Sequence, residues 1–156
     1  FNNITAEITI YTDASLGKLD DKKSGAGVVG LWGDSSDYNL IAYSCGKVKR
    51  VVKSVFAAEL YAVSEGLGYG VMIKALLQEL SFDPPIRLFT DSAQVVSLAN
   101  SVSAVPTDKG SILELREVQE KVEKGEASIN WVESKSNPAD VLTKRGVSPR
   151  VIERMI

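Results

Sequence analysis

Four carboxylates in this sequence are placed where they could do acid–base or metal chemistry together: Asp13, Glu59, Asp91 and Asp140. Asp13 and Asp91 each follow a threonine at the end of an apolar segment with the pattern of a short strand. In an open α/β sheet, ligands gather outside the carboxyl ends of the strands. The two aspartates are therefore expected to converge on one site.

Crowded carboxylates repel one another unless a cation neutralises them. The chain has no histidine and a single cysteine, Cys45, which excludes Ser-His-Asp and Cys-His catalysis as well as ordinary imidazole or multi-cysteine zinc sites. Hard oxygen ligands alone select Mg²⁺ or Mn²⁺. Two such ions could activate a water and stabilise the leaving oxygen in phosphodiester cleavage.

Each acid also has a simpler interpretation. Asp13 and Asp91 could be turn or helix-capping residues, and Glu59 could be an ordinary exposed helix residue. Asp140 follows Asn137 by three positions, which is nearly a capping box and also suits the helix dipole. The four acids taken together favour a shared site over four separate structural roles.

The first part of the chain predicts an antiparallel meander. Apolar residues alternate with polar ones from residue 4, which predicts a strand that ends at Asp13. Further strands are expected at 25–32 and 38–45, and the glycines of the first of these indicate a bulge or a close backbone approach.

A long helix is expected after this meander, with Ser54 as its N-cap. Apolar residues at helical spacing form one stripe that would lie on the sheet: Phe56, Leu60, Val63 and Leu67. Glu59 lies on the flank of this stripe, where a carboxylate needs a partner. The helical pattern extends to Leu80, although three intervening glycines leave that extension open.

The second part of the chain alternates strands with helices. The expected elements are strands at 86–90 and 128–132 and helices at 93–101 and 111–124. These two strands should be parallel and covered by helices. Another helix should open with Asn137 as N-cap and Pro138 at its first position, which puts Asp140 at the third. A last short helix is expected from Ser148 to the end.

Length and composition predict a single domain over residues 1–156, with 24% charged residues. We find no apolar run approaching the roughly 20 residues of a membrane span, so we expect a soluble protein without a membrane partner. The lone cysteine is compatible with a reducing, intracellular compartment. The first residue is not methionine, which is compatible with excision from a longer polypeptide.

Basic residues are concentrated in one short stretch although the net charge is −2. Four of them lie within seven positions before the long helix: Lys47, Lys49, Arg50 and Lys53. A weaker group comprises Lys135, Lys144 and Arg145. Such runs are either a solvated surface or a patch that contacts nucleic-acid phosphates.

The motifs around the four acids resemble those of ribonuclease H. They are Thr12-Asp13-Ala14-Ser15, Ala57-Ala58-Glu59-Leu60, Phe89-Thr90-Asp91-Ser92 and Asn137-Pro138-Ala139-Asp140, in the same order and on the expected elements. The resemblance covers residues 7–145. The ending Asn137–Lys144 is similar to the ribonuclease H domain of reverse transcriptase polyproteins from LTR retrotransposons, especially the copia type.

This resemblance implies an α/β, ribonuclease H-like fold, with a five-stranded mixed sheet ordered 3-2-1-4-5 and helices on both faces. It implies an endoribonuclease that hydrolyses the RNA strand of RNA/DNA hybrids, with Asp13, Glu59, Asp91 and Asp140 as ligands of two Mg²⁺ ions, for which Mn²⁺ could substitute. Ser92 and either Ser54 or Lys53 would contact the nucleic-acid backbone. The resemblance also implies an attached polymerase domain and a cytoplasmic setting that includes virus-like particles.

Two departures from the family pattern bear on this expectation. Many members carry a histidine on a loop before the last aspartate, whereas this chain has Glu133-Ser134-Lys135-Ser136, and Lys135 could substitute as a point charge. Nothing in 101–110 is basic enough for the protrusion with which cellular members grip the hybrid. Weak affinity of the isolated domain is therefore expected. The alternatives are a non-catalytic connection-like domain, or another nuclease or strand transferase of the same fold.

Overall fold

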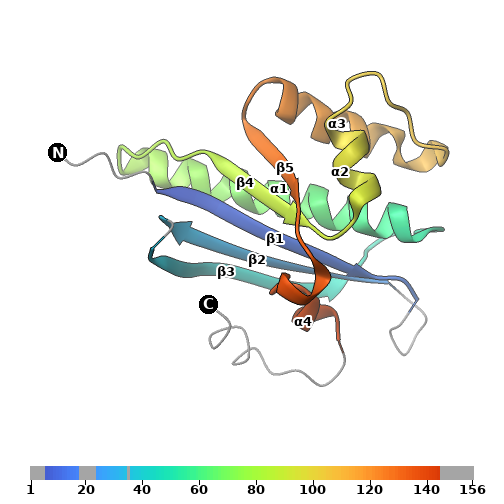
Figure 1. Cartoon of the computed structure of the whole chain (residues 1–156), viewed down its shortest axis with the longest axis horizontal. Helices are drawn as coiled ribbons and strands as arrows, with labels where there is room; N and C mark the ends of the chain where they lie inside the picture. The colour runs from blue at the N-terminus through green and yellow to red at the C-terminus, as the bar shows by residue number, and fades with distance from the viewer. Residues whose placement is uncertain (1–5, 18–23, 35, 145–156) are drawn as a thin grey trace.

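The computed structural model describes residues 6–17, 24–34 and 36–144. Within them, five strands form one mixed sheet in the order β3-β2-β1-β4-β5, as Figure 1 shows. The strands are β1 (Glu7–Ser15), β2 (Gly25–Gly33), β3 (Tyr38–Lys47), β4 (Ile86–Thr90) and β5 (Ala127–Trp131). β1 to β3 form an antiparallel meander, whereas β4 and β5 run parallel to β1. The predicted fold class and strand order are confirmed.

Helices cover both faces of the sheet. The longer ones, α1 (Val55–Glu79), α2 (Ala93–Ala99) and α3 (Ile112–Glu123), lie on one face. They bury the main core against alternate residues of β1 and β4, among them Ile10 and Leu88, which have no exposed surface. The short α4 (Asp140–Thr143) lies on the other face, where Ala139 and Leu142 pack near Val29 of β2.

α1 is one continuous helix despite its three glycines, which settles the question that the sequence left open. Ser54 is its N-cap as predicted, and the Ser54 hydroxyl oxygen accepts a hydrogen bond from the Ala57 amide at 3.0 Å. Gly66 is required for close packing, because an added Cβ there would lie 2.5 Å from Cγ2 of Thr12. The glycine therefore lets α1 lie directly on β1, beside the residue that precedes Asp13.

α1 is also long and apolar enough, by length and composition alone, to cross a membrane. Its inner side, including Leu60, Val63 and Leu67, is buried against the sheet, which is the arrangement of a core helix in a globular domain. Its outer side also carries exposed apolar residues, Met72 and Leu76 among them. The buried inner side and these exposed outer residues together account for the apolar composition of α1. The length and composition of α1 are therefore weak evidence for a membrane span.

Several predicted boundaries were wrong. β1 does not end at Asp13 but continues to Ser15, because Asp13 still pairs with Gly27 of the hairpin partner. α2 ends at Ala99, α3 begins at Ile112, and β5 is one residue earlier than expected. The irregularity predicted for β2 is present between Gly30 and Leu31. Residue 4 and the helix expected from 148 lie outside the described residues.

The largest correction concerns Asn137, which is not the N-cap of the helix that contains Asp140. α4 begins at Asp140, after Ala139. Asn137 is buried and its side-chain nitrogen donates to the Thr12 carbonyl oxygen at 2.9 Å, while its side-chain oxygen accepts from the Ala139 amide at 3.1 Å. These two hydrogen bonds of Asn137 tie the turn before α4 to β1. They favour a turn at 137–139 over an earlier start of the helix.

Candidate metal centre

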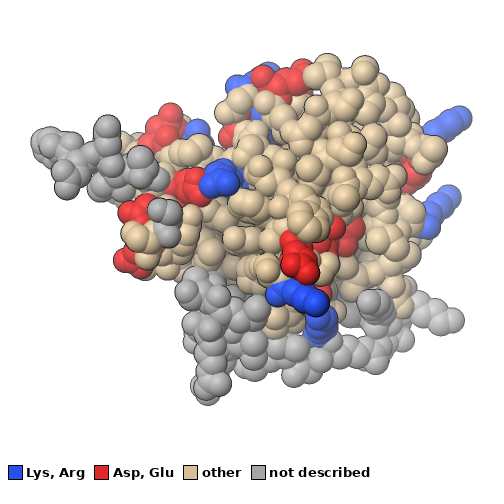
Figure 2. Space-filling model, in the orientation of Figure 1, with Lys and Arg blue, Asp and Glu red and all other residues tan. Residues whose placement is uncertain are grey.

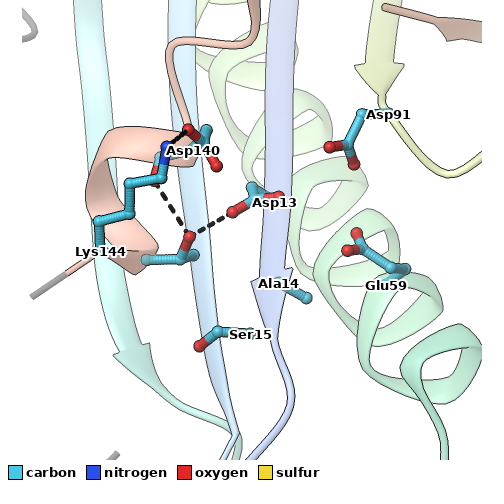
Figure 3. A pocket seen from close by; sticks show the side chains of 8 residues that line it. Asp13, Ala14, Ser15, Glu59, Asp91, Asp140 and Lys144 are labelled. Atoms are coloured by element: carbon cyan, nitrogen blue, oxygen red, sulfur yellow. Dashed lines mark hydrogen bonds and ion pairs between the residues drawn. The ribbon is translucent and has the colours of Figure 1, made fainter. Parts of the chain in front are cut away.

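Three of the four predicted carboxylates meet at the carboxyl-terminal end of β1 and β4. Asp13, Glu59 and Asp91 each offer an oxygen, and these oxygens all lie within 4.8 Å of one another. Figure 3 shows that the three side chains come from β1, α1 and the end of β4 and point toward one another. The sequence-based expectation that Asp13 and Asp91 lie together is met by this geometry.

Asp140 lines the same hollow from the other side of β1, on α4. The hollow has a volume of about 540 Å³, and its lining also includes Ser15, Thr143 and Lys144. In the orientation of Figure 1, Figure 2 shows acidic side chains next to basic ones in the neighbourhood of α4. All four predicted acids therefore face one space, although Asp140 is not part of the close group of three.

Burial is the main electrostatic feature of this group. Burial of Glu59, together with the nearby Asp13 and Asp91, raises the pKa of its carboxyl to about 8. Burial also raises the pKa of Asp13 to about 6, with the charges of Asp91 and Asp140 adding to the effect and a hydrogen bond from Thr143 opposing it. One Glu59 oxygen, Oε2, is buried without a hydrogen-bond partner. Within the part of the chain that the structure describes, Asp13, Glu59 and Asp91 form no ion pair that would compensate their charge.

Neighbouring hydroxyls fix two of the aspartates. The Ser134 hydroxyl donates to Asp91 Oδ2 at 2.6 Å, and the Thr143 hydroxyl donates to Asp13 Oδ2. Lys144, the residue that follows α4, forms an ion pair with Asp140. Sequence reasoning assigned no role to Ser134 or Thr143 and placed Lys144 only in a basic group. The i, i+4 spacing from Asp140 to Lys144 was the available signal.

Lys135, the predicted substitute for the missing histidine, is exposed in a short 3-10 helix and is not among the residues that line the hollow. Lys144 is the basic residue that lines it. Ser92 caps α2, its hydroxyl oxygen accepting from the Val95 amide at 3.4 Å. The structure therefore gives Ser92, like Ser54, a capping role, and backbone contact by either residue stays a prediction.

The predicted basic stretch lies between the end of β3 and the start of α1. Lys47, Lys49 and Arg50 line one shallow hollow there. Arg50 and Lys53 line a second one together with Lys109. Arg50 is also paired with Glu114 and lies over the Tyr61 ring, 5.7 Å from its centroid. Figure 2 shows basic side chains at its right-hand edge, which is the end of the molecule at which α1 begins.

A scan against models of known protein families finds no match. Solved structures, by contrast, show clear similarity in fold. Ribonuclease H1 from the archaeon Halobacterium salinarum aligns with a TM-score of 0.61 at 21% identity, covering 87% of this chain and 93% of that one. LC11-RNase H1, isolated from compost, gives a TM-score of 0.66 at 19% identity and coverages of 93% and 98%. A second structure of LC11-RNase H1 is in complex with an RNA/DNA hybrid.

A viral enzyme shares the fold within a longer chain. The protease-reverse transcriptase of prototype foamy virus aligns with a TM-score of 0.55 at 17% identity, covering 93% of this chain but 21% of the viral one. This chain thus corresponds to about one fifth of that polypeptide. Sheet order, helix placement and these similarities agree that the chain has the ribonuclease H-like fold. Within that fold, Asp13, Glu59 and Asp91 form an acidic group that could bind a metal.

Proposed function

We propose that this protein is a metal-dependent endoribonuclease that hydrolyses the RNA strand of RNA/DNA hybrids. The observation that carries the proposal is the convergence of Asp13, Glu59 and Asp91 on one point, with Asp140 facing the same hollow. Similarity in fold to LC11-RNase H1, which has been solved with such a hybrid, supports the choice of substrate.

The residues present fit a divalent cation. Every candidate ligand is a carboxylate oxygen, and a hard cation bound by oxygen is typically Mg²⁺, Mn²⁺ or Ca²⁺. The buried, unpartnered Oε2 of Glu59 is a group that a cation would satisfy. We therefore propose Mg²⁺ as the cofactor, as two ions, with Mn²⁺ as a substitute.

When bound, such ions would supply Lewis-acid stabilisation of charge and a water of lowered pKa. The chain's own residues supply positions for this chemistry. Ser134 orients Asp91, and Thr143 orients Asp13, so that both carboxylates keep an oxygen toward the hollow. Glu59 is fixed by the packing of α1 on β1. Preorganised groups of this kind need little rearrangement when charge develops on a phosphate.

The basic residues around the start of α1 would bind the backbone of the hybrid. Lys49, Lys53 and Lys109 are exposed and lie at the rims of the two hollows described above. Contacts to phosphates carry no base information, so recognition would rest on the shape of the hybrid and on the 2′-hydroxyls of the RNA. We propose this surface as the second part of the substrate site.

We further propose that the domain acts as part of a retroelement reverse transcriptase in an intracellular setting. The foamy virus chain is an example of this fold within a longer reverse transcriptase polypeptide. An attached polymerase would raise the local concentration of hybrid and so compensate for weak binding by the isolated domain. A connection-like scaffold is a poorer fit, because it gains nothing from a buried carboxylate oxygen that lacks a partner, as in Glu59.

The test is cleavage of a labelled RNA/DNA hybrid beside single-stranded RNA, duplex RNA and duplex DNA, with Mg²⁺, Mn²⁺ or chelator. Cleavage should be confined to the RNA of the hybrid, require metal, and fall by at least about 10²-fold in Asp91→Asn. Asp83→Asn, an exposed aspartate 72% accessible in its side chain, is the matched control and should retain activity.

Absence of cleavage would have two separable causes: the isolated domain binds the hybrid too weakly, or its site does not catalyse the reaction. Fusion to a hybrid-binding module raises the effective concentration of substrate. Activity restored by this tether would identify missing affinity, in agreement with the proposal. If the tethered protein cleaves no hybrid with either Mg²⁺ or Mn²⁺, the proposed function is refuted.

A further inference from the structure

The four carboxylates of the hollow are not equivalent. Asp13, Glu59 and Asp91 form the close group in which each offers a ligand oxygen. Asp140 lines the same hollow, but its Oδ2 is bound to the ammonium of Lys144, one helical turn later. Figure 3 shows this pair at α4 and the residue after it, across β1 from Glu59 and Asp91. Among the described residues, Asp140 is thus the one acid of the four that forms an ion pair, although the charge of Lys144 also reaches Asp13.

The position of Lys144 makes this pair relevant to the site. Its side chain is 64% exposed and that of Asp140 is 24% exposed, so the lysine lies on the solvent side of the carboxylate. Both residues line the hollow. Thr143, between them, is hydrogen-bonded to Asp13, which ties this turn of α4 to the group of three.

We propose that Lys144 is an internal counter-cation that holds Asp140 outside the metal centre, and that Lys144 must leave Asp140 before that carboxylate can serve as a ligand. The inference rests on the proposed metal centre and goes beyond it, since it predicts two unequal binding events. A first ion needs only Asp13, Glu59 and Asp91. A second binding event, which uses Asp140, competes with the Lys144 ammonium.

The competition should be modest and measurable. Ion pairs between exposed side chains contribute little, because water and salt screen them. Removing the lysine should therefore strengthen the second event by about two- to fivefold. Lys144 forms its ion pair with Asp140 and acts on the ligands of the first event only through the more distant Asp13, so the affinity of the first event should change less.

The experiment is a titration of the metal-free chain with Mn²⁺, in which free Mn²⁺ is counted by electron paramagnetic resonance and heat is measured in parallel with Mg²⁺. Neither readout depends on activity. Wild type should show a tighter and a weaker event. Asp140→Asn should abolish the weaker one and so identify it. In Lys144→Gln the weaker event should become about two- to fivefold tighter.

Three further variants separate competition from other effects. Lys144→Arg keeps the positive charge and should stay close to wild type. Lys124→Gln removes an exposed lysine from a comparable i, i+4 pair with Glu120 on α3, and should change neither event. In Asp140→Asn, adding Lys144→Gln should not restore the weaker event. Thermal unfolding in chelator checks that each variant is folded.

The outcomes distinguish this inference from the proposed function. Two events that Lys144→Gln leaves unchanged or weakens would overturn the role of Lys144 while the metal centre stands. A gain of the same size in both events would also overturn it, because it would show a general charge effect. No binding of either metal by the folded wild type would overturn the metal centre itself, and the role of Lys144 with it.

Discussion

Glu59 offers a test of the site that needs neither substrate nor metal. The residue is 6% exposed, one of its carboxyl oxygens has no partner, and burial raises the pKa of the carboxyl from 4.5 to about 8. Because the folded pKa lies above the unfolded one, the native state binds this proton more tightly. The contribution of Glu59 to stability is therefore intact below about pH 4.5 and falls as the pH rises through 8.

Glu59→Gln removes the ionisation and keeps the shape of the side chain. One pKa unit corresponds to about 1.4 kcal/mol, so the shift from 4.5 to about 8 gives an upper limit of roughly 5 kcal/mol at pH 9. Part of this shift is repulsion by Asp13 and Asp91, which can relax. We expect Glu59→Gln to stabilise the metal-free protein by about 2–4 kcal/mol at pH 9 and by almost nothing at pH 4.

The assay is thermal unfolding in chelator across this pH range. For a domain of this size, the expected gain corresponds to a Tm higher by roughly 5–15 °C at pH 9. Glu65→Gln is the matched control, since Glu65 is an exposed residue of the same helix, and it should show no such trend. Mg²⁺ should raise the Tm of wild type more than that of Glu59→Gln. A pH-independent difference between Glu59→Gln and wild type would refute the reasoning.

The remaining predictions concern packing and substrate binding. Gly66→Ala should lower the free energy of unfolding by about 1–3 kcal/mol, because the added Cβ would lie 2.5 Å from Thr12. Gly68→Ala, where an added Cβ meets nothing within 4 Å, should raise the free energy of unfolding by about 0.5–1 kcal/mol. Urea unfolding measures both variants, and equal effects would contradict the assigned packing. Lys49→Ala and Lys53→Ala should each lower the salt slope of hybrid binding, measured by fluorescence anisotropy, by about one. An unchanged slope in both variants would remove this surface from the substrate site.

Much of the fold followed from local patterns in the sequence. Period-two alternation located β1, and the apolar stripe of α1 with Ser54 as N-cap located the long helix, because these signals depend on neighbours along the chain. The errors lie where tertiary pairing decides. β1 continues beyond Asp13 because its partner strand does, and Asn137 bonds to Thr12, 125 residues away, instead of capping a helix.

In the site, too, local sequence patterns predicted some features, and tertiary structure decided the others. All four acids were predicted from motif and position, and they face one hollow. Their unequal surroundings could not be predicted from spacing. The hydrogen bond from Ser134 to Asp91 joins segments 43 residues apart, and the one from Thr143 to Asp13 joins segments 130 residues apart. Only the three-dimensional arrangement of β1, β4, α4 and the short 3-10 helix Ser134–Ser136 brings these hydroxyls to the carboxylates.

Two glycines, one in α1 and one in β2, explain how helices on both faces of the sheet reach one point. Gly66 allows α1 to lie against Thr12, which brings Glu59 beside Asp13. Gly27, the partner of Asp13 on β2, allows α4 to approach from the other face, since a Cβ there would lie 2.9 Å from Cβ of Leu142. A side chain at either position would push one helix outward. The convergence of the acids therefore depends on two residues that carry no functional group.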